Sequence, residues 1–427
     1  MRGLALGIDV GTSGVRICAL DRTGALVASS SVAMPAPRRR GRAVRQDARV
    51  WWSAARKALA RLTDAIDRRA VRAVAVDGTS GSVLAVDGNG APLAPARMYN
   101  DSSAADAARV IADVAPPTTA AHGASSALAR AIELQQVPGS ARILHQADWV
   151  AGQLSGRYDV TDENNALKTG YDPVHRQWPD WIARTGMQAR LLPDVVPAGT
   201  RIGSIRAEIA RDFGLPSDVA VVTGTTDGCA AFLATGAARA GDGVTSLGST
   251  LTLKLLTDAP VFAPAFGIYS HRIGDGWLAG GASNSGGAVL LSFFSRRRLR
   301  SLEQRLDPDR PTGFDYYPLP AAGERFPFND PALAPRVAPR PPDDHVFLQG
   351  LLEGIAAIEA LGYRRLAELG ATKLASLRTV GGGAANQAWT RIRQLRLGVP
   401  FLAARADEAA AGAARLAWRG LGVEIAP

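Results

Sequence analysis

The chain has 427 residues, too many for one ordinary hydrophobic core, and this length predicts two domains of roughly 200 residues each. Hydrophobic residues make up 47% of the chain and charged residues 21%, which is typical of a globular protein and excludes disorder of the whole. No uninterrupted apolar stretch approaches the roughly 20 residues that a membrane span needs, and the N-terminus leads directly into a strand-like segment. We therefore expect a cytoplasmic protein without a membrane partner. Cys18 and Cys229 are too few for a disulfide framework and lack metal-ligand spacing.

The formal net charge of +10 is carried by arginine, because lysine occurs only at Lys57, Lys168, Lys254 and Lys373. With abundant alanine, this excess is typical of a GC-rich genome. Attraction of anionic nucleotide substrates is the second interpretation. The arginine runs at 38–40 and 296–298 lack interleaved aromatic residues, so we interpret them as solvated surface and expect no nucleic-acid partner.

The first part of the chain predicts an antiparallel meander, then a helix and another strand. Strand-like segments at Leu4–Asp9, Val15–Leu20 and Leu26–Ser31 are separated by tight turns. Apolar residues then recur at helical spacing over Arg49–Asp67, and an apolar strand follows at Ala73–Asp77. This mixture of elements predicts an α/β domain.

A similar pattern occurs in the second half. Val219–Val222 is an apolar strand that ends in Thr-Gly-Thr-Thr-Asp-Gly, and Val244–Leu247 turns through three small residues into Leu251–Leu256. Each half thus carries a strand, a Gly/Ser/Thr turn and a second strand. The repetition suggests a duplicated domain with a cleft between the copies.

Prolines crowd the segment 307–344, where regular elements cannot form. Aromatic residues give this segment apolar anchors, so we expect an ordered surface excursion and not a domain boundary. Beyond it the pattern predicts a helix at Val346–Leu369, a strand at Leu377–Val380, a helix at Asn386–Leu397, a strand at Val399–Phe401 and a final helix at about 407–420.

The sequence Gly11-Thr12-Ser13-Gly14 forms a glycine-bounded hydroxyl turn shortly after Asp9. Such a turn can present backbone N–H groups and hydroxyls to a phosphate, while the nearby carboxylate holds Mg²⁺ directly or through water. An ordinary β-hairpin with a capping aspartate explains the same residues when they are taken alone.

Two later turns have related chemistry. Gly248-Ser249-Thr250 repeats the glycine and hydroxyl pattern, and the two hydroxyl turns together could clamp one triphosphate. A third turn, 381–383, leads through glycines into a helix at Asn386, where the backbone can approach a flat ring or a phosphate; a tight packing turn is the alternative. The chain contains no G-x-x-x-x-G-K-[ST] loop, so a P-loop enzyme is not expected.

Asp227 follows the apolar strand of the second half and precedes a helix-like segment. In phosphoryl transfer a protein orients the reactants, neutralises phosphate charge and supplies a carboxylate that accepts the proton of the attacking hydroxyl. Asp227 is our candidate for that base. A helix N-cap is the alternative role for the same residue.

Two polar clusters at strand ends could bind the hydroxyls of a small ligand. One is the segment 77–81, which contains Ser80, and the other is the segment 98–101, which contains Asp101. Hydrogen bonding within loops explains each cluster equally well. The histidines are scattered without ligand spacing and do not support a catalytic metal cluster.

The ordered set of motifs resembles the FGGY family of carbohydrate kinases over nearly the whole chain. The resemblance is carried by the segments 6–13, 46–47 before Trp51-Trp52, 77–80, 168–172, 224–228, 323–325 and 381–386. It implies an α/β fold of two ribonuclease H-like (actin-like ATPase) domains with an interdomain cleft. The sugar would bind an N-terminal domain of residues 1–223, joined by a C-terminal helix at 407–427, and ATP would bind a domain of residues 224–406.

The resemblance also implies a role for each matching residue. Asp9 is similar to the carboxylate that contacts Mg²⁺ and the substrate, Asp227 to the catalytic base, and Asp9, Ser80 and Asp227 to sugar contacts, with Asp101 a further candidate. ATP is implied at the first phosphate turn (Gly11, Thr12, Ser13 and Gly14), the second phosphate turn (Gly248, Ser249 and Thr250) and an adenosine site (Gly382, Gly383 and Asn386).

Departures from the family pattern bear on the substrate. Arg45 precedes Gln46 where glycerol and xylulose kinases usually have Glu, and the segment 98–103 lacks their Arg. These departures argue against glycerol. The short length and the segments 77–80 and 98–101 resemble a compact xylulose kinase-like subgroup whose members phosphorylate D-ribulose. We therefore predict conversion of D-ribulose to D-ribulose 5-phosphate, with D-xylulose or another pentulose or polyol as the alternative. A catalytically lapsed actin-fold sensor of nucleotide or sugar is the alternative of another class, and both monomer and homodimer stay open.

Overall fold

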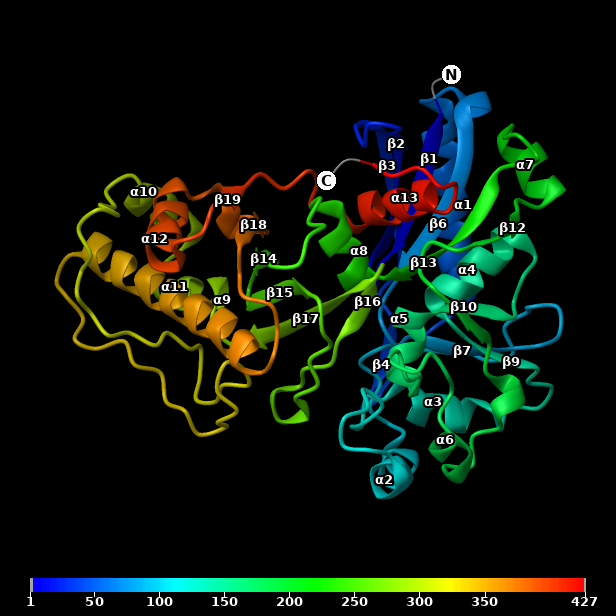
Figure 1. Ribbon diagram of the computed structural model, residues 1–427, viewed down its shortest axis with the longest axis horizontal. Coiled ribbons are helices and arrows are strands. Elements are labelled where there is room, and N and C mark those ends of the chain that lie inside the picture. Colours follow the sequence, from blue (N-terminus) through cyan, green and yellow to red (C-terminus); the bar gives the residue numbers. More distant parts are fainter. Residues whose placement is uncertain (1–2, 426–427) are drawn as a thin grey trace. The chain divides into compact units, whose positions relative to one another are not determined.

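The computed structural model describes residues 3–425, and Figure 1 shows its helices and strands. Contacts within the chain divide it into two compact units. In the part described, the first unit comprises residues 3–236, 271–274 and 408–425, and the second comprises Ala237–Ser270 and Asp275–Asp407.

A six-stranded sheet forms the centre of the first unit. Its strands lie in the order β12 (Arg201–Ser204), β13 (Ala220–Thr226), β6 (Val71–Gly78), β1 (Leu4–Val10), β2 (Gly14–Asp21) and β3 (Leu26–Ala33). β1, β2 and β3 pair antiparallel, which confirms the predicted meander, whereas β1, β6 and β13 pair parallel. Nearly every residue of the parallel strands is buried, as expected for strands covered on both faces. Their carboxyl ends therefore lie together at one edge of the sheet.

The helices of the first unit are α1 (Ala48–Asp64), α2 (Ala105–Val114), α3 (Ala127–Leu134), α4 (Gln146–Ser155), α5 (Glu163–Ala166), α6 (Trp181–Arg184), α7 (Ala207–Phe213), α8 (Asp227–Ala234) and α13 (Ala409–Arg419). Alternate side chains of β1 join different core layers. Leu6 and Ile8 pack in the cluster that contains Trp51 of α1, whereas Ala5 packs with Leu416 of α13. The alternation follows from the two-residue period of a strand. Through these contacts α13 belongs to the first unit.

Glycines allow α13 to approach the sheet and α8 closely. A Cβ atom on Gly7 of β1 would lie 1.9 Å from the Ala410 carbonyl oxygen, and one on Gly412 would lie 1.9 Å from the Ala230 carbonyl oxygen. These contacts hold α8 within the first unit. The division between the units consequently falls after Gly236, later in the chain than the expected boundary after residue 223.

A smaller five-stranded sheet extends the first unit beyond its central sheet. Its strands lie in the order β4 (Arg38–Arg40), β5 (Ala43–Gln46), β8 (Ala96–Arg97), β7 (Val83–Val86) and β9 (Arg142–His145). β10 (Val160–Asp162) and β11 (Asp194–Val196) form a separate parallel pair. α3 packs against β7, so the segments that follow β6 and β8 are held between regular elements.

The second unit contains its own mixed sheet. β17 (Gly276–Ser283), β15 (Leu251–Thr257), β14 (Asp242–Leu247), β18 (Ser376–Val380) and β19 (Phe401–Leu402) lie in this order. Its helices are α9 (Gly287–Phe293), α10 (Arg296–Glu303), α11 (Asp344–Glu368) and α12 (Gln387–Leu397). β14 and β15 form the predicted strand-turn-strand, and β14 pairs parallel with β18.

The proline-rich segment is ordered by its aromatic side chains. Tyr316, Tyr317 and Phe326 are buried in the core of the second unit, and Phe314 stacks on Tyr316 with ring centroids 4.9 Å apart. Regular elements are absent from residues 307–342, all of which the structure describes. The predicted surface excursion with apolar anchors is thus confirmed.

Among the described residues, α11 alone is long and apolar enough to span a membrane by length and composition. However, 72% of its most apolar window is buried within the protein, where Phe347, Leu351 and Ile355 join the core of the second unit. Such burial is typical of the central helix of a globular unit.

The close approach of α13 and α8 gives a stability prediction. Gly412→Ala would normally favour a helix by about 1 kcal/mol, but its Cβ would collide with the Ala230 carbonyl. Overpacking typically costs about 1–3 kcal/mol, so we expect a lower midpoint in urea and in thermal unfolding. Gly203→Ala is the control, because a Cβ there meets nothing within 4 Å. A Gly412→Ala protein as stable as the control would contradict this packing.

Candidate functional site

Three acidic side chains follow one another along the carboxyl edge of the first sheet. Asp9 stands near the end of β1, Asp77 near the end of β6, and Asp227 directly after β13. The register pairs Asp9 with Asp77, and Thr225 with Asp77. The predicted residues Asp9 and Asp227 therefore flank a third carboxylate, Asp77, on the central strand.

Burial dominates the electrostatics of this edge. Asp77 is fully buried and Asp9 is 5% exposed, and desolvation raises the pKa of both carboxyl groups. The charges of Asp9 and Asp227 raise the pKa of Asp77 further, while Arg16, whose Nη1 lies 3.3 Å from Asp9 Oδ2, acts against the shift at Asp9. No donor among the described residues bonds a carboxylate oxygen of Asp77, and its polar neighbour is the Asp9 carboxyl, with which it can share a proton. Adjacent buried carboxylates favour a shared proton or a bound cation.

The donor set at this edge fits a magnesium ion. Mg²⁺ is commonly held by one or two carboxylates, with water and substrate phosphates completing its coordination. Asp9 and Asp77 offer such a pair of oxygen ligands. Residues 3–425 contain no group of three or more His, Cys, Asp or Glu side chains that could hold a metal by themselves. The chain would therefore hold the ion together with phosphates rather than in a closed protein cage.

Asp227 is the first residue of α8, but it does not cap that helix. Thr226 occupies the N-cap, and its hydroxyl accepts a hydrogen bond of 3.4 Å from the backbone N–H of Cys229. The Asp227 carboxylate accepts a hydrogen bond of 2.7 Å from the N–H of Gly228. Because another residue performs the capping, the alternative interpretation of Asp227 loses its basis.

The first phosphate turn connects β1 to β2. The Gly11 N–H donates to the Gly14 carbonyl at 3.0 Å, and the Met34 N–H donates to the Ser13 carbonyl at 2.8 Å. Ser13 is exposed and Thr12 half-buried. The turn is thus fixed through its backbone while its hydroxyl groups remain accessible.

The second phosphate turn connects β14 to β15 in the second unit. Its carbonyls accept hydrogen bonds from the start of α9, with Gly287 N–H to Gly248 O at 2.9 Å and Ala288 N–H to Ser249 O at 3.0 Å. Ser249 and Thr250 are exposed. As in the first turn, the backbone is held and the hydroxyls are presented outward.

The third turn lies beside the second. Gly381 has φ +86°, and a Cβ there would lie 2.9 Å from the Leu247 carbonyl oxygen, so glycine is required by both conformation and space. Gly382 meets nothing within 4 Å, which leaves room for a ligand to approach its backbone. Asn386 caps α12 by accepting a 2.8 Å hydrogen bond from the Trp389 N–H. Packing explains Gly381, but it does not explain Gly382.

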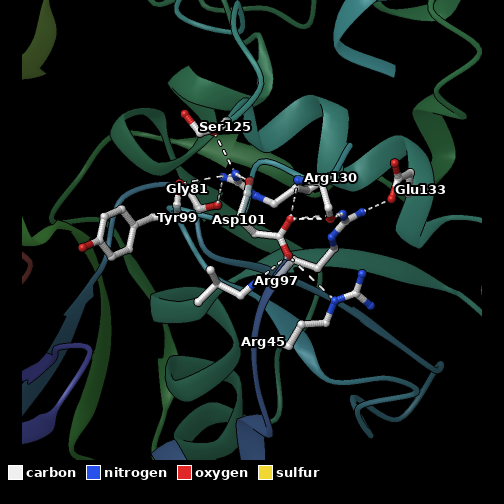
Figure 2. Close-up of polar contacts among 10 residues, drawn as sticks. Arg45, Gly81, Arg97, Tyr99, Asp101, Ser125, Arg130 and Glu133 are labelled. Carbon is white, nitrogen blue, oxygen red and sulfur yellow. Dashed lines mark hydrogen bonds and ion pairs between the residues drawn. The ribbon is translucent and has the colours of Figure 1, made fainter. Parts of the chain in front are cut away.

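Asp101 is engaged within the chain, as Figure 2 shows. Its Oδ1 accepts hydrogen bonds from the backbone and side chain of Ser103 and from Arg97, and its Oδ2 accepts one from the Val44 N–H and faces Arg45 at 3.7 Å. The side chain is completely buried. These contacts give Asp101 a part in holding its loop, in place of the free carboxylate that a sugar contact would offer.

Ser80 has the opposite environment. Its Oγ is buried and has no hydrogen-bond partner among the described residues, and the same holds for Oδ1 of Asn100. Buried polar groups in native proteins are nearly always paired. The two atoms are therefore suited to receive a polar ligand.

Arg130 of α3 joins the two loops that carry these atoms (Figure 2). Its fully buried guanidinium donates to the carbonyls of Gly81 at 2.6 Å, Asp101 at 2.8 Å, Ser125 at 2.8 Å and Tyr99 at 3.3 Å. Burial lowers the pKa of Arg130 to about 10, so the group stays charged at neutral pH. A planar guanidinium with several donors suits such convergent carbonyls.

Sequence reasoning did not single out Asp77 as a functional carboxylate, nor Arg130 and Gln146, whose side chains bond the loop that follows β6. Asp77 ends an apolar strand just as Asp9 does, and this shared pattern could have indicated it. Arg130 stands in an alanine-rich helix and Gln146 begins a helix directly after β9. No local signal distinguishes either residue from an ordinary surface side chain.

The match to family models covers most of the chain. The N-terminal domain of the FGGY family of carbohydrate kinases matches residues 4–119 and 130–234, and the C-terminal domain of that family matches residues 236–421. A sugar phosphotransferase is the class that this fold and these turns define. The chain belongs to the FGGY family of carbohydrate kinases, which use ATP as the phosphate donor.

Similar proteins span nearly the whole chain. A xylulose kinase of Staphylococcus epidermidis is 22% identical over 99% of this chain and 89% of its own length, and an L-fuculokinase of Salmonella typhi is 26% identical over 99% and 93%. Among solved structures, a xylulose kinase from Rhodospirillum rubrum has a TM-score of 0.84 at 22% identity over 98% and 90% of the two chains. Plasmodium falciparum glycerol kinase with ADP has a TM-score of 0.85 at 15% identity over 99% and 90%. These likenesses confirm the α/β actin-like ATPase fold.

The environment of Asp77 predicts that its carboxyl group lowers the stability of the fold while it supports activity. Because its pKa is raised in the folded protein, the folded state keeps a proton that the unfolded state releases, and stability falls as pH rises above the ordinary carboxyl value. Each pH unit in this window costs about 1.4 kcal/mol. Asp77→Asn should therefore raise the Tm at pH 7 in metal-free buffer, with a smaller gain near pH 4, while metal-dependent activity falls roughly 10- to 100-fold.

Asp21→Asn is the control of opposite sign. The Thr23 hydroxyl and nearby backbone N–H groups lower the pKa of Asp21, so its carboxylate stabilises the fold above the ordinary carboxyl value and loses this effect as pH falls. That variant should have a lower Tm at pH 7. A lower Tm for Asp77→Asn as well would argue against a cost of burying the Asp77 charge.

Proposed function

We propose that this kinase transfers the γ-phosphate of ATP to a hydroxyl of a ketopentose, with D-ribulose as the first candidate and D-ribulose 5-phosphate as the product. The observation that carries the proposal is the row of Asp9, Asp77 and Asp227 at the ends of three parallel strands. Ligands of open α/β sheets bind at this edge. A row of carboxylates there supplies both a base and ligands for a divalent cation.

Each residue has a defined part in this reaction. Asp227 accepts the proton of the attacking hydroxyl and, with Asp9 and Ser80, contacts the sugar. Asp9 and Asp77 hold Mg²⁺, which neutralises phosphate charge when it is bound. The first turn binds phosphate through Thr12 and Ser13.

In the second unit, phosphate binds the turn at Gly248, Ser249 and Thr250, and adenosine binds at Gly382, Gly383 and Asn386. Support comes from the exposed hydroxyls of the second turn and from the open space over Gly382. Backbone amides and hydroxyls without a bulky side chain are what a phosphate or a flat base needs for close approach.

One observation supports a pentulose as the acceptor, and a second favours D-ribulose over glycerol and D-xylulose. Several similar proteins are xylulose kinases, which act on a five-carbon ketose. The segment 98–103 lacks the arginine that glycerol and xylulose kinases usually carry, and its aspartate is engaged by the chain. D-Xylulose or another pentulose or polyol is the alternative acceptor.

A cytoplasmic location is part of the same proposal, because the similar bacterial proteins are metabolic kinases that draw on ATP. The proposal needs no nucleic-acid or membrane partner. It is compatible with a monomer and with a homodimer.

Asp227→Asn tests the proposed base. The variant keeps the size of the side chain but accepts no proton, so kcat should fall about 10²- to 10⁴-fold while ATP binding stays close to that of the unchanged protein. Asp218→Asn, an exposed residue in the turn before β13, is the control and should keep full activity. Equal loss of ATP binding and of kcat would indicate a structural role for Asp227.

The acceptor is identified by coupled ADP release with Mg²⁺ and ATP. The panel is D-ribulose, L-ribulose, D-xylulose, L-xylulose, ribitol and glycerol. We expect the highest kcat/KM with D-ribulose, because the proposed site binds a neutral pentulose. A clear preference for another sugar of the panel would correct the substrate alone. Slow turnover that no sugar stimulates would instead favour a sensor that binds nucleotide without transferring phosphate.

A further inference from the structure

A directed chain of hydrogen bonds ends at Gln146. The Tyr99 N–H donates to Ser82 Oγ at 3.0 Å, Ser82 Oγ lies 2.7 Å from Thr79 Oγ1, and Thr79 Oγ1 donates to Gln146 Oε1 at 2.6 Å. Since Thr79 donates its single hydroxyl proton to Gln146, Ser82 must donate to Thr79. Every proton in the chain thus points toward the amide oxygen of Gln146.

The orientation of the Gln146 amide is fixed by this network. The Thr79 backbone N–H, which can only donate, lies 2.9 Å from the same Gln146 oxygen. A flipped amide would place an NH₂ group against that N–H, so the assignment of Oε1 and Nε2 is unambiguous. The NH₂ group must therefore occupy the other position.

That NH₂ group is buried and unused. Gln146 is 0% exposed, and no residue within 3–425 offers its Nε2 a hydrogen-bond acceptor. Two accepted hydrogen bonds at Oε1 polarise the amide and make its N–H groups better donors. Native proteins rarely leave such a donor without an acceptor, which indicates that the acceptor comes from outside the chain.

Gln146 lies at the carboxyl end of β6. It is the first residue of α4, and its Oε1 would be 3.2 Å from a Cβ on Gly78, the residue that follows Asp77 in β6. Its backbone N–H donates to the Ser82 carbonyl at 3.1 Å, which fixes the start of the helix against the turn that carries Ser80. The unused donor and the unpaired Ser80 Oγ therefore belong to neighbouring segments at the carboxyl edge of the sheet.

We propose that Gln146 is a sugar-binding residue, whose Nε2 donates a hydrogen bond to a neutral hydroxyl or carbonyl oxygen of the substrate. This inference rests on the proposed function, and it adds a residue that binds the sugar to which phosphate is transferred.

Gln146→Met tests the proposal, since methionine has a similar length and no N–H donor. We expect KM for D-ribulose to rise roughly 10- to 100-fold while KM for ATP stays unchanged. Gln153→Met is the matched control, because Gln153 lies in the same helix and bonds Tyr158 instead. This control should keep both KM values.

Monodeoxy analogues of the sugar distinguish a direct contact from a structural effect. The analogue that lacks the bonded oxygen should bind the unchanged enzyme more weakly, but it should lose nothing further with Gln146→Met. If the losses simply add for every analogue, Nε2 holds a trapped water or only shapes the site, and the proposal is overturned.

Gln146→Glu covers the case in which the methionine variant does not fold. The glutamate keeps an oxygen acceptor for Thr79 and, in its ionised form, has no donor, so at alkaline pH it should likewise raise KM for the sugar alone. An unchanged sugar KM in a folded variant overturns the role of Gln146 while the kinase remains. If the unchanged protein phosphorylates no sugar of the panel, the proposed function fails first, and the two failures are distinct.

Discussion

The burial of Asp9 and Asp77 side by side is the constraint on which the first unit depends. Two carboxylates removed from water at neighbouring strand ends repel each other and lack solvation, so an isolated pair of strands would separate or admit water. The parallel pairing of β1 with β6 and of β6 with β13 keeps them in register, and the layers led by α1 and α13 exclude solvent from both faces. Binding of a cation or a proton would lower the electrostatic free energy of these two buried carboxylates.

Local sequence was sufficient for features that arise from chain neighbours. An apolar run that ends in an acid and a Gly/Ser/Thr turn indicated Asp9, and the same logic indicated Asp227; helical periodicity placed α1, α11 and α12 to within a few residues. Local sequence did not indicate where the two units divide. The division depends on the contact of Gly412 with Ala230, and these residues are far apart in sequence. Spacing along the chain carries no record of such an approach.

Asp101 and Arg130 show where local patterns stop. Both a ligand-binding aspartate and a loop-holding aspartate follow a strand and precede polar residues, so the sequence alone favours neither. Only tertiary contacts reveal that Arg97 and Ser103 occupy the carboxylate of Asp101, and that Arg130 fastens its loop to Gly81. A polar residue at a strand end is a candidate for function. The hydrogen-bond partners of its oxygen atoms show whether it holds a loop or is free to bind a ligand.

The position of α13 sets an order of events during synthesis. β1 leaves the ribosome long before α13, the helix that covers one of its faces, has been made. Until α13 is made, Ala5, Ala75 and Val222 form an apolar surface that no helix covers. The second unit lies before α13 in the chain and can fold around its own sheet. Chains that lack α13 thus carry this sheet with one face uncovered, and exposed apolar surface of that kind favours aggregation.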